Sequence, residues 1–242
     1  MMRSLLTATR PVNDVPRVIW LLLLISLIGQ CLFHYFQADL EATKKPLSSP
    51  PDSEIISLVG LSDRLTSARL TMLWLQAFDN QPGISLSLKE LDYARVIEWL
   101  DVILQLDSHM QYPLLAAARF YAEVPDSGRQ RQMLRFIQDK FLQQPDVRWS
   151  SMAHAVYIAK HRLGDIELAR HFARLLRLHA TAAHVPYWAK QMEFFVLEDM
   201  GELEAARILI GGLLDSGELD DPQQQRFLAE RLQQLEQRIQ SQ

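Results

Sequence analysis

The chain has 242 residues, enough for one large domain or two small ones, and its 48% hydrophobic and 22% charged residues are ordinary for a folded protein. Its net charge of −4 argues against a basic surface for nucleic acid. A single cysteine, Cys31, excludes an internal disulfide framework.

An uncharged apolar segment stands near the N-terminus. Residues 18–38 carry no formal charge, and as a helix they would extend over roughly 31 Å, which matches the hydrocarbon core of a bilayer. A cleaved signal peptide is the main alternative, but residues 33–36 are all large, whereas cleavage requires small residues. A lipoprotein box ending at Cys31 is weakened by Gln30, which stands where a small residue is needed. We therefore expect an uncleaved transmembrane helix over residues 18–38.

Basic residues flank this segment unevenly. Three arginines precede it against one acid, whereas Lys44 and Lys45 follow it with two acids. The positive-inside rule counts basic residues, so the bias favours a cytoplasmic tail over residues 1–17 and a C-terminal part outside the cytoplasm. In a Gram-negative bacterium this would be an inner-membrane anchor with a periplasmic C-terminal part.

Two segments of different composition follow. Residues 39–52 are rich in proline and serine, which disfavours a helix and predicts an extended linker. Residues 53–88 are predicted to form a leading helix and a loop. Ser62 or Asp63 is a suitable N-cap for that helix, and the Asn-Gln-Pro-Gly run at 80–83 ends it.

One pattern occurs twice, 37 residues apart. Leu-Gly-Asp-Ile-Glu-Leu-Ala-Arg at 163–170 returns as Met-Gly-Glu-Leu-Glu-Ala-Ala-Arg at 200–207. The helix-stopping glycine, the acidic helix start and the alanine keep the same register. This arrangement is typical of a helical-hairpin repeat.

The surrounding sequence predicts three helix pairs within residues 89–216. The first helices begin near Tyr112, Trp149 and Tyr187 and carry aromatic residues 37 apart at Phe120, Tyr157 and Phe194. Breaks follow at 124–126, 163–165 and 200–202, and the second helices cover 129–143, 166–179 and 203–214. A helix over residues 89–105 leads into the array, and Ser87 or Lys89 is expected to open it.

The C-terminal region, residues 217–242, is predicted to contain a helix from Pro222 to Gln240. It has one apolar stripe and mostly glutamine elsewhere, which describes a capping helix at the end of a helical array. The same spacing also resembles a two-heptad coiled coil. Two heptads are too few to dimerise securely, so capping is the favoured interpretation.

Small and large residues alternate in both copies of the pattern: Gly164 and Ala169 with Phe172, and Gly201 and Ala206 with Leu209. With Leu106 and Asp107 at the end of an earlier helix, this resembles the tetratricopeptide repeat (TPR) superfamily over residues 89–216. The period is about 37 instead of 34 residues, and the tryptophan-leucine-glycine signature of the first helix is absent. The resemblance implies an all-α, right-handed superhelix of antiparallel helix pairs whose first helices line a concave, peptide-holding face. It implies no chemistry.

The sequence contains no residue pattern typical of an enzyme. Five histidines cluster between 154 and 184, but without an HExxH or paired CxxC pattern they are expected to be structural, and no metal is expected. No nucleophile elbow, phosphate-binding glycine loop or dinucleotide fingerprint occurs. We therefore expect neither catalysis nor a cofactor.

The candidate partner-binding residues form two groups. The first lies outside the repeats and comprises Trp74, Phe78, Asp79, Asn80, Gln81 and Tyr93. Aromatics beside hydrogen-bonding side chains are good binding anchors, although Trp74 and Phe78, at i and i+4, equally suit packing on the first repeat. The second group comprises Arg119, Arg170 and Arg207, together with Arg174 and Arg177. These arginines suit a groove for acidic peptide termini, or ion pairs with neighbouring acids on solvated faces.

The expected function is that of a membrane-anchored, non-catalytic scaffold or adaptor for protein partners that the sequence does not identify. The alternative is a chaperone-like or assembly factor that holds extended substrates of an envelope or secretion/pilus-type machine. An exposed apolar groove would suit varied extended peptides, and a charged groove one defined partner. Neither nucleic acid nor a small-molecule substrate is expected.

Overall fold

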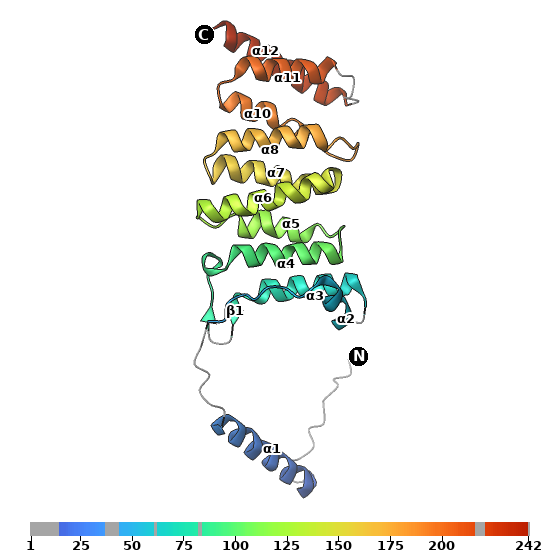
Figure 1. Cartoon of the computed structure of the whole chain (residues 1–242), viewed down its shortest axis with the longest axis vertical. Coiled ribbons are helices and arrows are strands. Elements are labelled where there is room, and N and C mark those ends of the chain that lie inside the picture. Colours follow the sequence, from blue (N-terminus) through green and yellow to red (C-terminus); the bar gives the residue numbers. More distant parts are fainter. Residues whose placement is uncertain (1–14, 37–43, 61, 82–83, 216–220, 242) are drawn as a thin grey trace, which may run out of the picture. The chain divides into compact units, whose positions relative to one another are not determined.

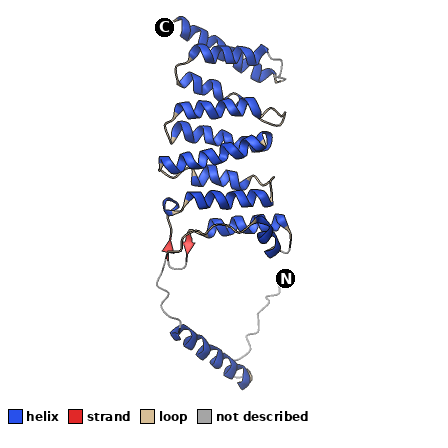
Figure 2. Ribbon diagram, in the orientation of Figure 1, coloured by secondary structure: helices blue, strands red, loops and turns tan. Residues whose placement is uncertain are grey.

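The computed structural model describes residues 15–36, 44–60, 62–81, 84–215 and 221–241. These residues are helical almost throughout, which confirms the all-α prediction (Figure 2). The chain divides into two compact units, residues 1–44 with 82–84 and residues 45–81 with 85–242.

The first unit contains α1 (Arg17–Phe36), whose side chains from Arg17 to Tyr35 are exposed. The stretch Arg17–Tyr35 is long and apolar enough to cross a membrane, and none of it is buried within the protein. A signal sequence would share this length and composition, so α1 is a candidate span. Residues 37 and 38 of the predicted span lie outside the described residues.

The second unit is a stack of helices joined by short connections. Its helices are α2 (Ser53–Val59), α3 (Arg64–Ala77), α4 (Tyr93–Leu106), α5 (Tyr112–Ala116), the π-helical turn η3 (Ala117–Tyr121), α6 (Ser127–Gln143), α7 (Pro145–His161), α8 (Ile166–His179), α9 (Tyr187–Lys190), α10 (Met192–Asp199), α11 (Leu203–Asp215) and α12 (Pro222–Gln240). Successive layers pack on one another from α3 to α12, so the stack follows the order of the sequence (Figure 1).

Both glycines of the repeated pattern end helices as expected. Gly164 and Gly201 have φ of +68° and +76°, a left-handed conformation in which a side chain is strained. After the first of them, the Asp165 carboxylate accepts the backbone N–H of Leu168 at 3.0 Å and starts α8 at Ile166. The predicted bounds of α8 and α12 coincide with the observed ones.

Two helix starts differ from the predictions. The helix expected near Trp149 begins at Pro145, because proline is favoured in the first helical turn, where its missing N–H costs nothing. The helix expected from residue 89 begins at Tyr93, because the Asp92 carboxylate accepts the backbone N–H groups of the first turn. Ser87 instead precedes a short 3₁₀ turn, η2 (Leu88–Glu90).

The first helix of the third pair is interrupted, and its aromatic residues are placed differently from those of the other two pairs. Gln191 separates α9 from α10, whereas α7 is continuous. Phe120 and Tyr157 are 49% and 42% exposed, but Phe194, the next residue in the 37-residue series, is fully buried. Its neighbour Phe195 is 36% exposed instead. Phe194 therefore keeps the 37-residue spacing but does not share the exposed environment of Phe120 and Tyr157.

Part of the expected linker 39–52 is packed on the helical stack. Leu47 is only 6% exposed, and the Trp99 indole N–H donates to the carbonyl of Ser48 at 2.8 Å. The side-chain amide of Gln81 brackets the backbone of Lys45, accepting its N–H at 2.8 Å and donating to its carbonyl at 2.9 Å. We call residues 45–51 the strap. Residues 39–43 lie outside the described part of the chain.

A small hairpin beside the strap was not predicted. Strands β1 (Asn80–Gln81) and β2 (Ile84–Ser85) pair as a two-stranded sheet, where the sequence suggested only a loop. Two-residue strands carry too short an alternation to be recognised from sequence.

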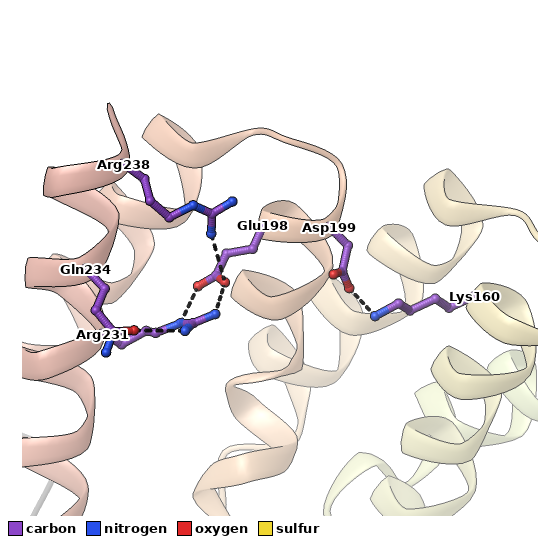
Figure 3. Close-up of polar contacts among 6 residues, drawn as sticks. All are labelled: Lys160, Glu198, Asp199, Arg231, Gln234 and Arg238. Atoms are coloured by element: carbon purple, nitrogen blue, oxygen red, sulfur yellow. Dashed lines mark hydrogen bonds and ion pairs between the residues drawn. The ribbon is translucent and has the colours of Figure 1, made fainter. Parts of the chain in front are cut away.

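The helix α12 ends the stack by packing on α11. Leu228 and Leu235, two turns apart, are buried in one cluster with Phe194 and Ile210. Figure 3 shows that Arg231 also makes a two-pronged ion pair with the buried carboxylate of Glu198 on α10, with one Nε–Oε1 contact of 2.9 Å. These contacts are those of a terminal helix folded back on its own chain.

Candidate interaction surface

The first helices of the stack border a groove of about 530 Å³. Its walls come from α5, η3, α7, α9 and α10. The side chains that define it include Arg119, Trp149, His154, Tyr157, Trp188 and Met192. We call this the first-helix groove.

Aromatic rings dominate the groove. Trp149 of α7 and Trp188 of α9 make an edge-to-face contact with ring centroids 5.5 Å apart. Tyr157 lies between His154 and His161, with centroid separations of 5.6 and 4.9 Å. Trp188 is 53% exposed and Tyr157 is 42% exposed, so these rings present apolar faces to solvent. Exposed aromatic surface of this kind is typical of binding sites.

One histidine gives the groove a polar group. The Nε2 atom of His154 is buried and has no hydrogen-bond partner among the described residues. Burial lowers the pKa of His154, and the positive charge of Arg119 lowers it further. Glu123 opposes this effect, but its Oε1 is 3.9 Å from Nε2, and its other oxygen forms an ion pair with Arg162 at 2.9 Å. His154 is therefore neutral near pH 7 and leaves the groove mainly apolar.

Trp74 and Phe78 pack together within the fold. Their ring centroids are 5.5 Å apart, and Trp74 also lies 4.5 Å from the ring of Trp99 on α4. Packing of these two rings within the fold was the predicted alternative to partner binding. Trp74 nevertheless remains 44% exposed.

The rest of the first candidate group also makes internal contacts. Tyr93 is only 3% exposed and donates its hydroxyl to the Tyr121 carbonyl at 2.9 Å, while burial raises its pKa to about 12. Gln81 holds the strap, and Asn80 donates to the Asp79 carboxylate at 2.9 Å. Asp79 additionally borders a separate cavity of about 140 Å³. These residues do not form one exposed patch, since Tyr93 lies in the core.

The five arginines of the second group do not all meet in one groove. Arg119 borders the first-helix groove, whereas Arg170, Arg174 and Arg177 border a different cavity of about 320 Å³. In that cavity Arg177 is paired with Glu193 at 2.7 Å. Arg207 on α11 is paired with Glu204 at 2.5 Å. Of the five, Arg119 is the one that borders the first-helix groove.

The groove residues Trp149, Trp188 and Met192 were not among the predicted partner-binding residues. The sequence carried a partial signal, because Trp149 and Trp188 are 39 residues apart, close to the 37-residue period. Among the described residues no group of three or more histidine, cysteine, aspartate or glutamate side chains could hold a metal ion.

No family model matches the chain, and comparison with curated proteins and with solved structures gave no match either.

Proposed function

We propose that this chain is a membrane-anchored, non-catalytic scaffold that binds extended segments of protein partners in the first-helix groove. The supporting observation is the exposure of Trp188 and Tyr157, on two successive first helices, around a groove of about 530 Å³. Tryptophan and tyrosine dominate the binding energy of protein interfaces because they bury large areas with few rotatable bonds.

The stack of helix pairs supports assignment to the TPR-like superhelices. In this proposal the stack coils to the right, and the first-helix groove is its concave side. The helix-ending glycines at 164 and 201 and the pairing of first with second helices support it. The binding mode would place an extended chain across α5, α7 and α9.

The proposed location is the bacterial inner membrane, with α1 as the span and the helical stack in the periplasm. The support is the length and apolar character of α1 and the arginines that precede it. A reporter fused to the C-terminus measures this directly. Activity of a reporter that works only in the cytoplasm would contradict the orientation.

A second candidate function is chaperone-like holding of varied extended substrates. The apolar lining of the groove favours it, because apolar contacts discriminate weakly among sequences. The two functions differ in the number of partners: a scaffold binds one or few, and a holding factor binds many.

Site-specific photo-crosslinking in intact membranes tests both. A photoreactive amino acid replaces Tyr157 or Trp188 in the groove, and Leu178, which is 49% exposed on the second helix α8, serves as the matched control. We expect adducts from the two groove positions that are absent from the control. One discrete adduct supports the scaffold, and a broad set supports the holding factor. Equal labelling at Leu178, or none at either groove position, would contradict both.

A further inference from the structure

The helix α3 carries apolar residues on both its buried and its exposed side. Its buried residues are Ala68, Met72 and Leu75, together with two small polar residues, Ser67 and Thr71, which are 3% and 9% exposed. Its exposed side carries three leucines, Leu65, Leu70 and Leu73, which are 53%, 56% and 61% exposed. A surface helix ordinarily shows polar residues to solvent and apolar ones to the core.

The buried polar groups are satisfied within the helix. The hydroxyl of Ser67 donates to the carbonyl of Asp63, and that of Thr71 to the carbonyl of Ser67, each at 2.7 Å. Burying them therefore costs little. Together with Ala68, Met72 and Leu75 they form the buried side of α3, and the exposed leucines are not part of it.

The exposed leucines share one face of the helix. At 100° per residue, Leu65, Leu73, Ala77 and Leu70 fall in order within one half of the helical wheel, with Leu73 near its middle. We call these four residues the outer face of α3. A helix with apolar residues on both sides is normally covered on both sides.

The opposite end of the stack differs. Among the described residues of α12, the exposed side chains are mostly glutamine, glutamate and arginine, and Phe227 is its large exposed apolar residue. That composition suits a terminal layer in water. The outer face of α3 does not, and Leu58 and Val59 of the neighbouring α2 are also 69% and 82% exposed.

We propose that the outer face of α3 is a lipid-binding surface that lies in the headgroup region of the same membrane that holds α1. The inference rests on the proposed role of α1 as a span. Amphipathic helices bind there by burying an apolar face about 5–10 Å deep while their polar side stays wet. Arg69, exposed on the same side, has a long side chain that can reach the phosphates.

The length of the connection favours lipid as the occupant. Only residues 37–44 separate α1 from the start of the strap, and fully extended they cover about 30 Å at most. The strap is in turn fixed to β1, the strand that follows α3, through Gln81, and to α4 through Trp99. A short tether raises the effective concentration of the membrane at this end of the stack, so even a weak apolar contact is occupied.

The size of the face argues against a second copy. A helix of 14 residues is about 21 Å long and about 10 Å wide, so its outer side covers a few hundred Å² at most. Stable protein interfaces bury about 800 Å² on each partner. A lipid surface has no such minimum when the chain is already anchored in it.

Fluorescence quenching of the full chain in nanodiscs of phosphatidylethanolamine and phosphatidylglycerol tests the proposal. An environment-sensitive probe is attached to one cysteine at a time: the native Cys31 in α1, or Leu73→Cys or Phe227→Cys on a Cys31→Ser background. Phe227 is the control because it is 45% exposed at the other end of the stack. We expect spin-labelled lipids to quench the probes at 31 and 73 and to leave the probe at 227 unchanged.

Each other outcome overturns the proposal in a recognisable way. Quenching at 31 without quenching at 73 leaves the span intact and removes the lipid-binding face. Energy transfer between labelled copies at 73, without lipid quenching, would show a second copy there instead. No quenching at 31 means that α1 is not a span, which contradicts both the proposed membrane anchor and the proposed lipid-binding face.

A second variant separates lipid contact from folding. With the probe at Leu65→Cys, the exchange Leu70→Asp should abolish lipid quenching, because a carboxylate on the outer face must stay hydrated. The matched exchange Leu178→Asp, on a leucine of α8 that is 49% exposed against 56% for Leu70, should leave quenching unchanged. Unaltered helical circular dichroism in both shows that the stack remains folded, and persistent quenching in Leu70→Asp overturns the proposal.

Discussion

Asp165 performs two tasks at the start of α8. Its Oδ1 accepts the N–H of Leu168 at 3.0 Å, and its Oδ2 accepts from Arg131 at 2.6 Å. The first of these contacts is the main cause, and the second a further cause, of the lowered pKa of this carboxyl. The cap and the ion pair can be separated by mutation.

We expect Asp165→Ala to destabilise the stack by about 1 kcal/mol, since it leaves a helix N–H unsatisfied. Asp165→Asn keeps a good cap and loses only a largely exposed ion pair, so its cost should stay below about 1 kcal/mol. Urea denaturation of the full chain measures both. Because the folded pKa lies below the ordinary 3.8, the wild-type advantage over Asp165→Ala is present above pH 3.8 and is lost as pH falls through the folded pKa. Equal costs at neutral pH would mean that the ion pair, not the cap, matters.

His154 makes the stability of the groove depend on pH. Its folded pKa is lower than the ordinary 6.5, so the unfolded chain binds more protons as pH falls below that value. We therefore expect wild-type stability to decline below pH 6.5 relative to His154→Gln, measured by thermal denaturation between pH 7.5 and 5. His161→Gln, on the exposed part of the same helix, is the comparison. An identical response from both variants would contradict a special role of burial at His154.

At the scale of elements, one buried carboxylate adds to the apolar packing that attaches α12 to the stack. Glu198 is 8% exposed, and Arg231 and Arg238 both approach it from α12 (Figure 3). Arg238 is the more distant, at 3.9 Å. A buried carboxylate without a hydrogen-bond donor is costly. Arg231 should therefore contribute more to the stability of the C-terminal layers than its position on a polar helix suggests.

We expect Arg231→Met to destabilise the C-terminal layers by about 1–3 kcal/mol, because Glu198 then stays buried without its two-pronged partner. Arg226→Met, exposed on the same helix, should stay within about 0.5 kcal/mol. The double variant Arg231→Met with Glu198→Gln should regain part of the loss, since the buried charge is gone. Denaturant unfolding of the three proteins gives the comparison, and no recovery in the double variant would exclude burial of charge as the cause.

The elements that could be predicted from sequence are those fixed by local signals. The helices α8 and α12 have strong caps and a clear apolar stripe, and their bounds follow from Asp165, Gly164 and Pro222. The strap could not be predicted, because it is held by residues far along the chain, such as Trp99, whose indole N–H donates to the carbonyl of Ser48. Likewise, nothing local distinguishes Tyr93 as buried, since its environment comes from Tyr121 and Arg129.

The candidate surface was only partly predictable for the same reason. Arg119 was singled out and does border the first-helix groove. Trp188 was not, because its contact with Trp149 arises only when two first helices lie side by side. The leucines at 65, 70 and 73 of α3 can be read from the sequence, but which side of the helix faces α4 is decided by packing.

At the scale of the whole helical stack, each layer packs mainly on its neighbours in sequence. A change that destabilises one layer should therefore affect mainly the layers next to it, as in repeat proteins, whose stability is a sum of layer and interface terms. This property lets the terminal layer be removed in an experiment.

We expect deletion of residues 222–242 to expose the cluster of Phe194, Leu203 and Ile210 without unfolding the far layers. Hydrogen exchange should then show lost protection in α10 and α11 and retained protection in α4 and α6. Protection in α8 serves as the internal measure of how far the effect spreads. Uniform loss of protection from α4 onwards would contradict layer-wise stability.

The strap has a mechanical consequence. Tension pulled along the backbone from residue 44 reaches the Gln81 bracket on Lys45 before it reaches any helix of the stack. Both bonds of that bracket belong to one side-chain amide, so they share the pull, and the buried Leu47 and the Trp99 bond to Ser48 come next in line. The strap would detach from the stack in steps. Each step would add a few residues to the tether while α3 and α4 stay folded. If α1 is the proposed anchor, the strap would yield under tension before the helices that border the first-helix groove.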